Sequence, residues 1–272
     1  MRILFTKSFW ELDLIGDWMA TFVARVAADG FDGTEMFLPL IADEPRRVLG
    51  LHEEYGLIRP VIDIVTEGIT PDEHLASFDS AVRKAVEFEP RLINSHTGRD
   101  IFPFVENVRL FQHGVAVSED IGVPIVHETH RFRPTYSAIE TKRYLDAVAE
   151  MQLTADLSHW MVVHESDLSD QPGNVEAALK RSRHIHARVG FEEGPQVDDP
   201  RDDHWSTQVS RHLGLWQRIL DYCRADAVEA ISITPEFGPP PYAMTLPGSR
   251  DPIADIWEIN VYMKDLVNRS LA

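Results

Sequence analysis

The sequence has a single cysteine and no long apolar run. Cys223 alone provides neither a disulfide framework nor a cysteine-based zinc site within the chain, and we expect it to be a core thiol on a helical stripe. No apolar stretch reaches the about 18 residues that a membrane span requires. The chain opens on the strand-like run Met1–Phe5 without a signal peptide, so we expect a cytoplasmic protein.

Positive charge is also scarce. The chain has 26 basic and 44 acidic residues and a formal net charge of −18. Nucleic acids and anionic membranes attract proteins through clustered Lys and Arg, so both are disfavoured as partners. We interpret the charge as a means of solubility. Flexible linkers, low-complexity tracts and internal repeats are missing as well, which favours one domain over residues 1–272.

Short apolar runs alternate with helical patterns eight times. The expected strands are 2–6, 31–36, 59–65, 91–96, 123–128, 153–156, 184–188 and 231–236. The expected helices are 15–29, 43–55, 73–88, 103–121, 136–150, 174–182 and 206–224, and a last helix that opens with Asp251-Pro252. This alternation predicts an α/β protein with a parallel sheet, and eight units in this length fit a closed (β/α)8 TIM barrel. A doubly wound open sheet is the competing fold, but the glycine-rich first turn typical of it is absent after Phe5.

Four consecutive strands in the second half end in residues that bind divalent metals. They are Glu128, Asp156, His186 and Glu236. The carboxyl ends of barrel strands meet at one mouth, where such folds place their chemistry. Three carboxylates and one imidazole favour Mn²⁺, with Mg²⁺ and Co²⁺ as alternatives and Zn²⁺ as a weaker one. The competing interpretation is structural, with ion pairs or helix caps for the carboxylates and a core position for the histidine.

Several other residues are expected at the same mouth. His96 ends the fourth strand, and we prefer a substrate-binding or supporting role for it over a core position. Glu35 ends the second strand and either orients a ligand or substrate hydroxyl or pairs with Lys7. Two long connections, 189–205 and 237–242, follow ligand-bearing strands and are expected to cover the mouth.

Four phrases resemble the xylose isomerase-like TIM barrel family. They are Gly30–Glu35 (GFDGTE), His127–His130 (HETH), Asp156–His159 (DLSH) and Ile185–Arg188 (IHAR). The resemblance spans nearly the whole chain. The family includes sugar phosphate isomerases and epimerases, ketose 3-epimerases, hydroxypyruvate isomerases, inosose dehydratases and the endonuclease IV enzymes.

The resemblance implies that Glu128, Asp156, His186 and Glu236 bind one metal ion. It also implies that Glu128 and Glu236 are catalytic and move a proton at the carbon next to a carbonyl, on opposite faces of the substrate. His159 and Arg188 would bind substrate oxygens. The endonuclease branch is disfavoured, because it requires a three-metal cluster with further histidines that the strand at 59–65 does not supply.

Two positions depart from the ketose 3-epimerases. Pro134 stands where they carry a second glutamate, and Glu192 stands where they carry an arginine. These differences disfavour a free ketose as the substrate. Arg131, Arg133 and Arg188 suggest an anionic group on it, with surface ion pairing as the alternative for the first two.

The prediction is a metal-dependent isomerase or epimerase of a small keto-sugar, polyol or acidic sugar derivative, which acts through enediolate proton transfer. The alternatives are a metal-dependent dehydratase of the inosose or keto-acid type and a non-catalytic sugar-binding barrel. The expected partner is a small carbohydrate, and a homo-oligomer is left open.

Overall fold

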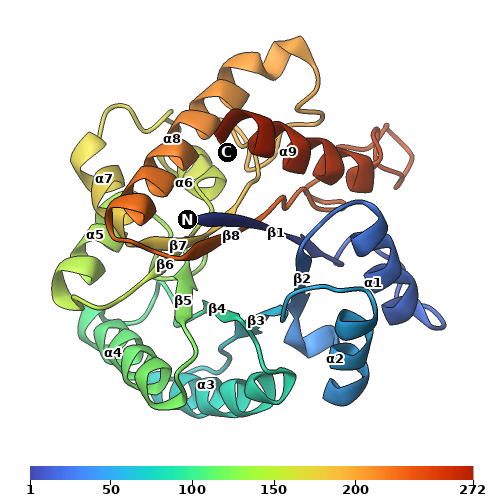
Figure 1. Cartoon of the computed structure of the whole chain (residues 1–272). Coiled ribbons are helices and arrows are strands. Elements are labelled where there is room, and N and C mark those ends of the chain that lie inside the picture. Colours follow the sequence, from blue (N-terminus) through green and yellow to red (C-terminus); the bar gives the residue numbers. More distant parts are fainter. Residues whose placement is uncertain (272) are drawn as a thin grey trace.

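Eight parallel strands close into a barrel in this computed structural model, which describes residues 1–271 (Figure 1). The strands are β1 (Arg2–Ser8), β2 (Gly33–Phe37), β3 (Val61–Val65), β4 (Leu92–His96), β5 (Ile125–Glu128), β6 (Leu153–Ala155), β7 (Ser182–His186) and β8 (Ala230–Thr234). Each strand pairs with the next, and β1 pairs with β8 to close the ring. The single-domain (β/α)8 barrel is therefore confirmed, and the open sheet is wrong.

The helices form a ring outside the strands, as Figure 1 shows. They are α1 (Trp18–Ala28), α2 (Pro45–Glu54), α3 (Pro71–Ala85), α4 (Phe104–Ile121), α5 (Ala138–Ala147), α6 (Ser158–His164), α7 (Pro172–Arg181), α8 (Ser206–Ala225) and α9 (Ile256–Leu271). Short 3₁₀ helices lie at Leu38–Leu40, Val86–Phe88 and Asp203–Trp205. The main hydrophobic core fills the space between the strands and this ring, and Cys223 is buried in it as expected.

The helix boundaries follow local capping. The Thr70 hydroxyl accepts the Glu73 backbone N–H, and the Glu73 carboxylate accepts the Thr70 N–H, which fixes the start of α3. The expected start of the last helix at Asp251-Pro252 is wrong. The Asp255 carboxylate accepts the Glu258 N–H at 3.1 Å, so this residue caps a helix that begins at Ile256.

Two further differences concern the segments that carry the site. The seven-residue helix α6 was not predicted, because two turns are too short to show a clear apolar period. β8 ends at Thr234, so Glu236 stands in the connection beyond the strand rather than at its last position. The expected mouth is nevertheless formed, since all eight strands run in the same direction.

The interior of the barrel is lined by polar side chains that bond to one another. Asn94 donates to Glu128 at 2.9 Å and accepts from the Thr154 hydroxyl at 2.6 Å. His184 lies 2.6 Å from the Ser232 hydroxyl on the neighbouring strand. Such a network is stable only when its members are paired, so it fixes the rotamers beneath the mouth.

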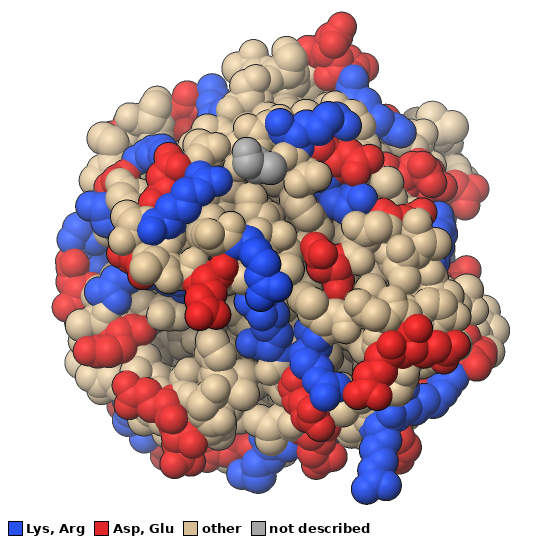
Figure 2. All heavy atoms as spheres, in the orientation of Figure 1, with Lys and Arg blue, Asp and Glu red and all other residues tan. Residues whose placement is uncertain are grey.

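The surface shows mixed charge. Figure 2 shows Lys and Arg side chains among Asp and Glu side chains over the face in view, with a short basic band near its centre. Within residues 1–271, none of the helices has both the length and the hydropathy to cross a membrane.

Because His127 is buried, we expect the free energy of unfolding to decrease in acid. The ring of His127 packs against Phe111 on α4, with ring centroids 4.9 Å apart, and a Cβ added at Gly114 would approach its Cε1 to 2.9 Å. Burial lowers the pKa of His127 to about 3. In the unfolded chain His127 binds a proton below about pH 6.5, whereas in the folded chain it does not. The contribution of His127 to the free energy of unfolding is therefore fully present above that pH and is lost as the pH falls toward 3.

We expect His127 to contribute a slope of about 1.4 kcal/mol per pH unit to the free energy of unfolding between pH 6 and 5. Denaturant unfolding of the wild type and of His127→Gln at several pH values measures this slope. The variant should show a shallower dependence, while His204→Gln on the exposed surface should match the wild type. Equal slopes for His127→Gln and the wild type would contradict the expectation.

Candidate active site and metal centre

Four predicted ligands come together at the mouth. One ligand atom each from Glu128, Asp156, His186 and Glu236 lies within 4.8 Å of the other three. Glu128 and His186 are the last residues of β5 and β7, Asp156 directly follows β6, and Glu236 lies two residues beyond β8. His186 Nδ1 is 3.0 Å from Glu236 Oε2 and 3.6 Å from Glu128 Oε2.

The orientation of His186 is that of a metal ligand. Its Nε2 is hydrogen-bonded to Glu35 Oε1 at 2.9 Å, which directs Nδ1 toward the three carboxylates. Nδ1 and Glu236 Oε2 are buried, and neither has a hydrogen-bond partner within residues 1–271. Metal-binding histidines characteristically give their second nitrogen to a carboxylate in this way. The donor set, and these two atoms that face each other at 3.0 Å without a hydrogen bond, therefore fit a divalent cation.

The same carboxylates control the proton affinity of this histidine. Burial alone would lower the pKa of His186, but Glu236, Glu35 and Glu128 outweigh it and raise that pKa well above its ordinary value. A cation bound by this group would therefore compete with a proton for Nδ1.

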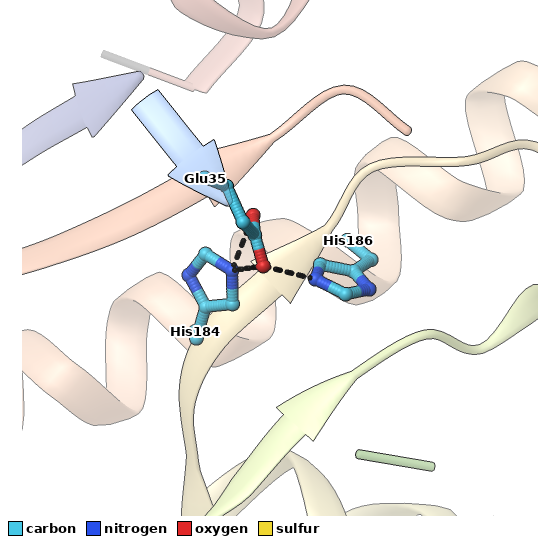
Figure 3. A group of neighbouring side chains, drawn as sticks. All are labelled: Glu35, His184 and His186. Carbon is cyan, nitrogen blue, oxygen red and sulfur yellow. Dashed lines mark hydrogen bonds and ion pairs between the residues drawn. The ribbon is translucent and has the colours of Figure 1, made fainter. Parts of the chain in front are cut away.

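Glu35 lies behind the ligands rather than on the substrate side. Figure 3 shows its carboxylate between the imidazoles of His184 and His186. His184 Nε2 is 3.1 Å from Glu35 Oε2, and the Thr234 hydroxyl donates to the same oxygen. Burial alone would raise the pKa of Glu35, but the two histidines hold it well below its ordinary value. The alternative pairing of Glu35 with Lys7 is wrong, because Lys7 pairs with Glu11.

Arg188 supplies the positive charge beside the carboxylates. It is fully buried, donates to Asp156, and has Nη2 3.5 Å from Glu236 Oε2. Asp156 is held in turn by the backbone N–H of Ser158 at 3.0 Å. Nη1 of Arg188 is buried and has no hydrogen-bond partner within residues 1–271, although the side chain borders the cavity.

His159 and the neighbouring arginines are placed differently from one another. His159 is fully buried behind Arg188, with Nε2 3.0 Å from that guanidinium and Nδ1 accepting from Arg131 Nε at 3.0 Å. Arg131 also reaches the Tyr242 hydroxyl at 3.5 Å. The expectation that Arg133 faces the mouth is wrong: it donates to main-chain carbonyls, including that of Gly98 at 2.9 Å, because its guanidinium turns inward.

A cavity of about 350 Å³ is lined by Glu128 and Glu236, two of the four predicted ligands. It is lined by Ser8, Trp10, Phe37, Leu40, Asp63, His96, Glu128, His130, Arg188, Glu236 and Tyr242. His96 Nε2 lies 3.1 Å from Glu128 Oε2, and burial lowers the pKa of His96 to about 4. A neutral imidazole therefore faces the cavity beside a carboxylate.

The aromatic wall of the cavity was not predicted. Trp10 and Tyr242 form it, with ring centroids 5.4 Å apart. Trp160 is not part of this wall, because it is buried with its indole N–H donated to the Thr135 carbonyl at 2.9 Å. A signal for Tyr242 existed, since it lies in one of the two connections expected at the mouth.

The two long connections support each other. Gln196 accepts the Gly238 N–H at 2.8 Å and donates to the Gly238 carbonyl at 3.2 Å. A Cβ added at Gly238 would overlap the Trp10 ring, so the indole lies directly on this backbone. Segment 237–242 therefore borders the cavity, and segment 189–205 holds it from outside.

Comparison with known proteins gives one family match. The family model described as xylose isomerase-like TIM barrel matches residues 23–231. None of the curated proteins matches the sequence.

Similar solved structures cover the whole barrel. A D-allulose 3-epimerase from Methylomonas sp., in complex with D-allulose, is 18% identical over 99% of this chain and 97% of its own, with a TM-score of 0.66. The probable 3-DHS dehydratase AsbF from Bacillus anthracis is 16% identical over 98% of this chain and 99% of its own, with a TM-score of 0.64. Endonuclease IV from Thermus thermophilus is 15% identical over 98% of each chain, with a TM-score of 0.56. At these identities the likeness is one of fold.

Proposed function

The chain belongs to the xylose isomerase-like TIM barrel family, and on that premise we propose that it is a metal-dependent isomerase or epimerase. Its substrate is a small keto-sugar, polyol or acidic sugar derivative. The observation that carries the proposal is the convergence of His186 Nδ1, which makes no hydrogen bond, with three carboxylates, two of which line a cavity of substrate size.

Glu128, Asp156, His186 and Glu236 would hold one divalent cation, for which Mn²⁺ is favoured and Mg²⁺, Co²⁺ and Zn²⁺ are alternatives. When bound, the cation would stabilise the negative charge that develops on the substrate's carbonyl oxygen. Arg188 forms ion pairs with Asp156 and Glu236, so its positive charge offsets part of the negative charge of the carboxylates.

The two glutamates are the proton-transfer groups in this proposal. Both border the cavity, Glu128 from β5 and Glu236 from beyond β8. One removes the proton from the carbon next to the carbonyl, and the other returns a proton to the opposite face. Burial alone would raise the pKa of Glu128, but His96 and His186 hold it well below its ordinary value, so this carboxylate is ionised in the site.

The remaining lining residues bind and enclose the substrate. His96 is neutral and serves a substrate hydroxyl as donor or acceptor. Arg188 lines the cavity, and its guanidinium binds a substrate oxygen. His159 does not border the cavity, so its proposed role is to position Arg188. Glu35 likewise positions His186. The rings of Trp10 and Tyr242 exclude water from the reacting carbon.

A dehydratase is the second candidate. The same proton abstraction followed by loss of a neighbouring hydroxyl is a dehydration, and similarity to a probable 3-DHS dehydratase favours keeping it. The products separate the two reactions, since dehydration releases water and leaves a carbon–carbon double bond.

Metal analysis of the purified protein, followed by proton–deuterium exchange in D₂O across a panel of keto-sugars, tests the proposal. We expect one divalent cation per chain and deuterium at the carbon next to the carbonyl of at least one sugar. Removal of the cation with a chelator should abolish the exchange, and Mn²⁺ should restore it. If the metal-loaded protein neither exchanges a proton of any of the sugars nor dehydrates any of them, the proposed reaction is wrong and the alternative of a non-catalytic sugar-binding barrel stands.

A further inference from the structure

We propose that Asn260 of α9 is a positioning residue for Glu236, on which it acts through the main chain of Phe237. The inference rests on the proposed function, in which Glu236 is both a ligand of the cation and a proton-transfer group. It concerns what holds this carboxylate at the site, because Glu236 stands two residues beyond the end of β8.

The segment that carries Glu236 lies outside the sheet. The last paired residue of β8 is Thr234, whose carbonyl accepts the Ala187 N–H at 2.7 Å. Within residues 1–271, no main-chain group of residues 235–238 is hydrogen-bonded to another main-chain group. A buried main-chain group without a partner is costly, so side chains have to supply the bonds that the sheet does not.

Two carboxamides supply these bonds, one for each of two consecutive residues. Asn260 Oδ1 accepts the Phe237 N–H at 2.9 Å, and its Nδ2 donates to the Phe237 carbonyl at 3.0 Å. Gln196 bonds both main-chain groups of Gly238 in the same manner. A carboxamide carries a donor and an acceptor side by side, so it substitutes for the missing strand. Of the two, Asn260 is fully buried and acts on the residue next to Glu236.

The surroundings of the Asn260 carboxamide fix its orientation. Nδ2 also lies 3.4 Å from Glu11 Oε1, and Glu11 is paired with the buried Lys7 of β1. Nδ2 therefore faces two acceptors, the Phe237 carbonyl and the Glu11 carboxylate, whereas Oδ1 faces a donor. A flipped amide would place its oxygen against both acceptors, so one orientation alone satisfies the network.

The position of Glu236 depends on this main chain. Its Oε2 lies 3.0 Å from His186 Nδ1 and 3.5 Å from Arg188 Nη2. Both contacts require Phe237, the next residue, to stay where Asn260 holds it. A misplacement of about 1 Å at a reacting group costs on the order of 100-fold in rate. Asn260 neither lines the cavity nor belongs to the proposed ligands, so it acts through the main chain alone.

A double-mutant cycle on cation affinity tests the inference. The affinity for Mn²⁺ is measured by chelator competition for the wild type, Asn260→Leu, Glu236→Ala and the double variant. We expect Asn260→Leu to lower the affinity of the wild type by about 10-fold, because the carboxylate ligand is no longer held in place. In the Glu236→Ala background it should lower the affinity no further, since the group that it positions is gone. Equal losses in the two backgrounds would overturn the proposal.

Ser118→Ala is the matched control, because Ser118 bridges main-chain groups in the same way at the opposite end of the barrel. Its hydroxyl donates to the Val123 carbonyl at 2.9 Å and accepts the Ile125 N–H at 3.1 Å, at the start of β5. Its removal should lower the midpoint of denaturant unfolding and leave the affinity for Mn²⁺ as in the wild type.

Asn260→Asp replaces Asn260→Leu in the cycle if the leucine variant does not fold. It keeps the size of the side chain and an acceptor for the Phe237 N–H, and it loses the donor to the Phe237 carbonyl. The same dependence on Glu236 is expected, and its absence in the folded variant would overturn the proposal.

Turnover and structure separate this inference from the proposed function. At saturating Mn²⁺ and sugar, Asn260→Leu should lose roughly 10- to 100-fold in kcat for deuterium exchange, with KM little changed. If the wild type binds Mn²⁺ but exchanges no proton, the proposed reaction is wrong and the affinity cycle still decides the role of Asn260. If the wild type binds no cation, crystal structures decide it: Glu236 Oε2 should move away from His186 Nδ1 in Asn260→Leu, and an unchanged contact of 3.0 Å would overturn the inference.

Discussion

Glu236→Gln is expected to slow deuterium exchange at the carbon next to the carbonyl by about 10²- to 10⁴-fold at saturating cation. Glu236 borders the cavity, and its Oε2 is buried without a hydrogen-bond partner within residues 1–271. Glutamine keeps the size of the side chain and one carbonyl oxygen, but its amide neither takes nor returns a proton at ordinary pH. The variant should therefore lose turnover more than sugar affinity.

Turnover and sugar affinity should be measured separately, with the bound cation quantified in each sample. Glu192→Gln is a matched control, because Glu192 lies in segment 189–205 and pairs with Arg211 at 3.0 Å, outside the cavity. It should behave as the wild type. Unchanged exchange in Glu236→Gln with the cation in place would remove this residue from the chemistry.

His186→Ala is expected to lower the affinity for the divalent cation by more than Glu35→Gln does. The first change removes the only nitrogen among the four proposed ligands. The second keeps that nitrogen but replaces the carboxylate that accepts the His186 Nε2–H at 2.9 Å with a neutral amide. Loss of such a supporting hydrogen bond typically lowers metal affinity by about 10- to 100-fold. The order of the two effects follows from their places in the site.

Competition with a chromophoric chelator measures both affinities without any reference to catalysis. His204→Ala on the exposed surface is the control and should bind the cation like the wild type. Folding of each variant is followed by circular dichroism, since Glu35 is buried and its loss affects packing. Wild-type affinity in a folded His186→Ala would show that the cation is not held here.

The fold could be predicted because its signals are local and repeated. Each strand is a short apolar run and each helix has its own stripe or cap, as the Thr70–Glu73 pair of α3 illustrates. The convergence of Glu128, Asp156 and His186 could be predicted too, since parallel strands in one barrel bring their carboxyl ends to one mouth.

The contacts within the site could not be predicted from spacing. Whether Arg188 points to the cavity or to Asp156 depends on rotamers that neighbouring elements impose, and it does both. His159 was expected at the substrate and lies behind Arg188 for the same reason. Asp63 lines the cavity and did leave a signal, because an acidic residue between two isoleucines in a strand must face away from their core.

The contact between Trp10 and Gly238 has a consequence for the size of molecule that the protein admits. The indole occupies space that a side chain at position 238 would otherwise take, and Trp10 also lines the cavity. The position of this part of the cavity wall thus depends on a residue that has no side chain and carries no reactive group. The size of the substrate that fits and the reaction that it undergoes are consequently set by different residues, so one can change without the other.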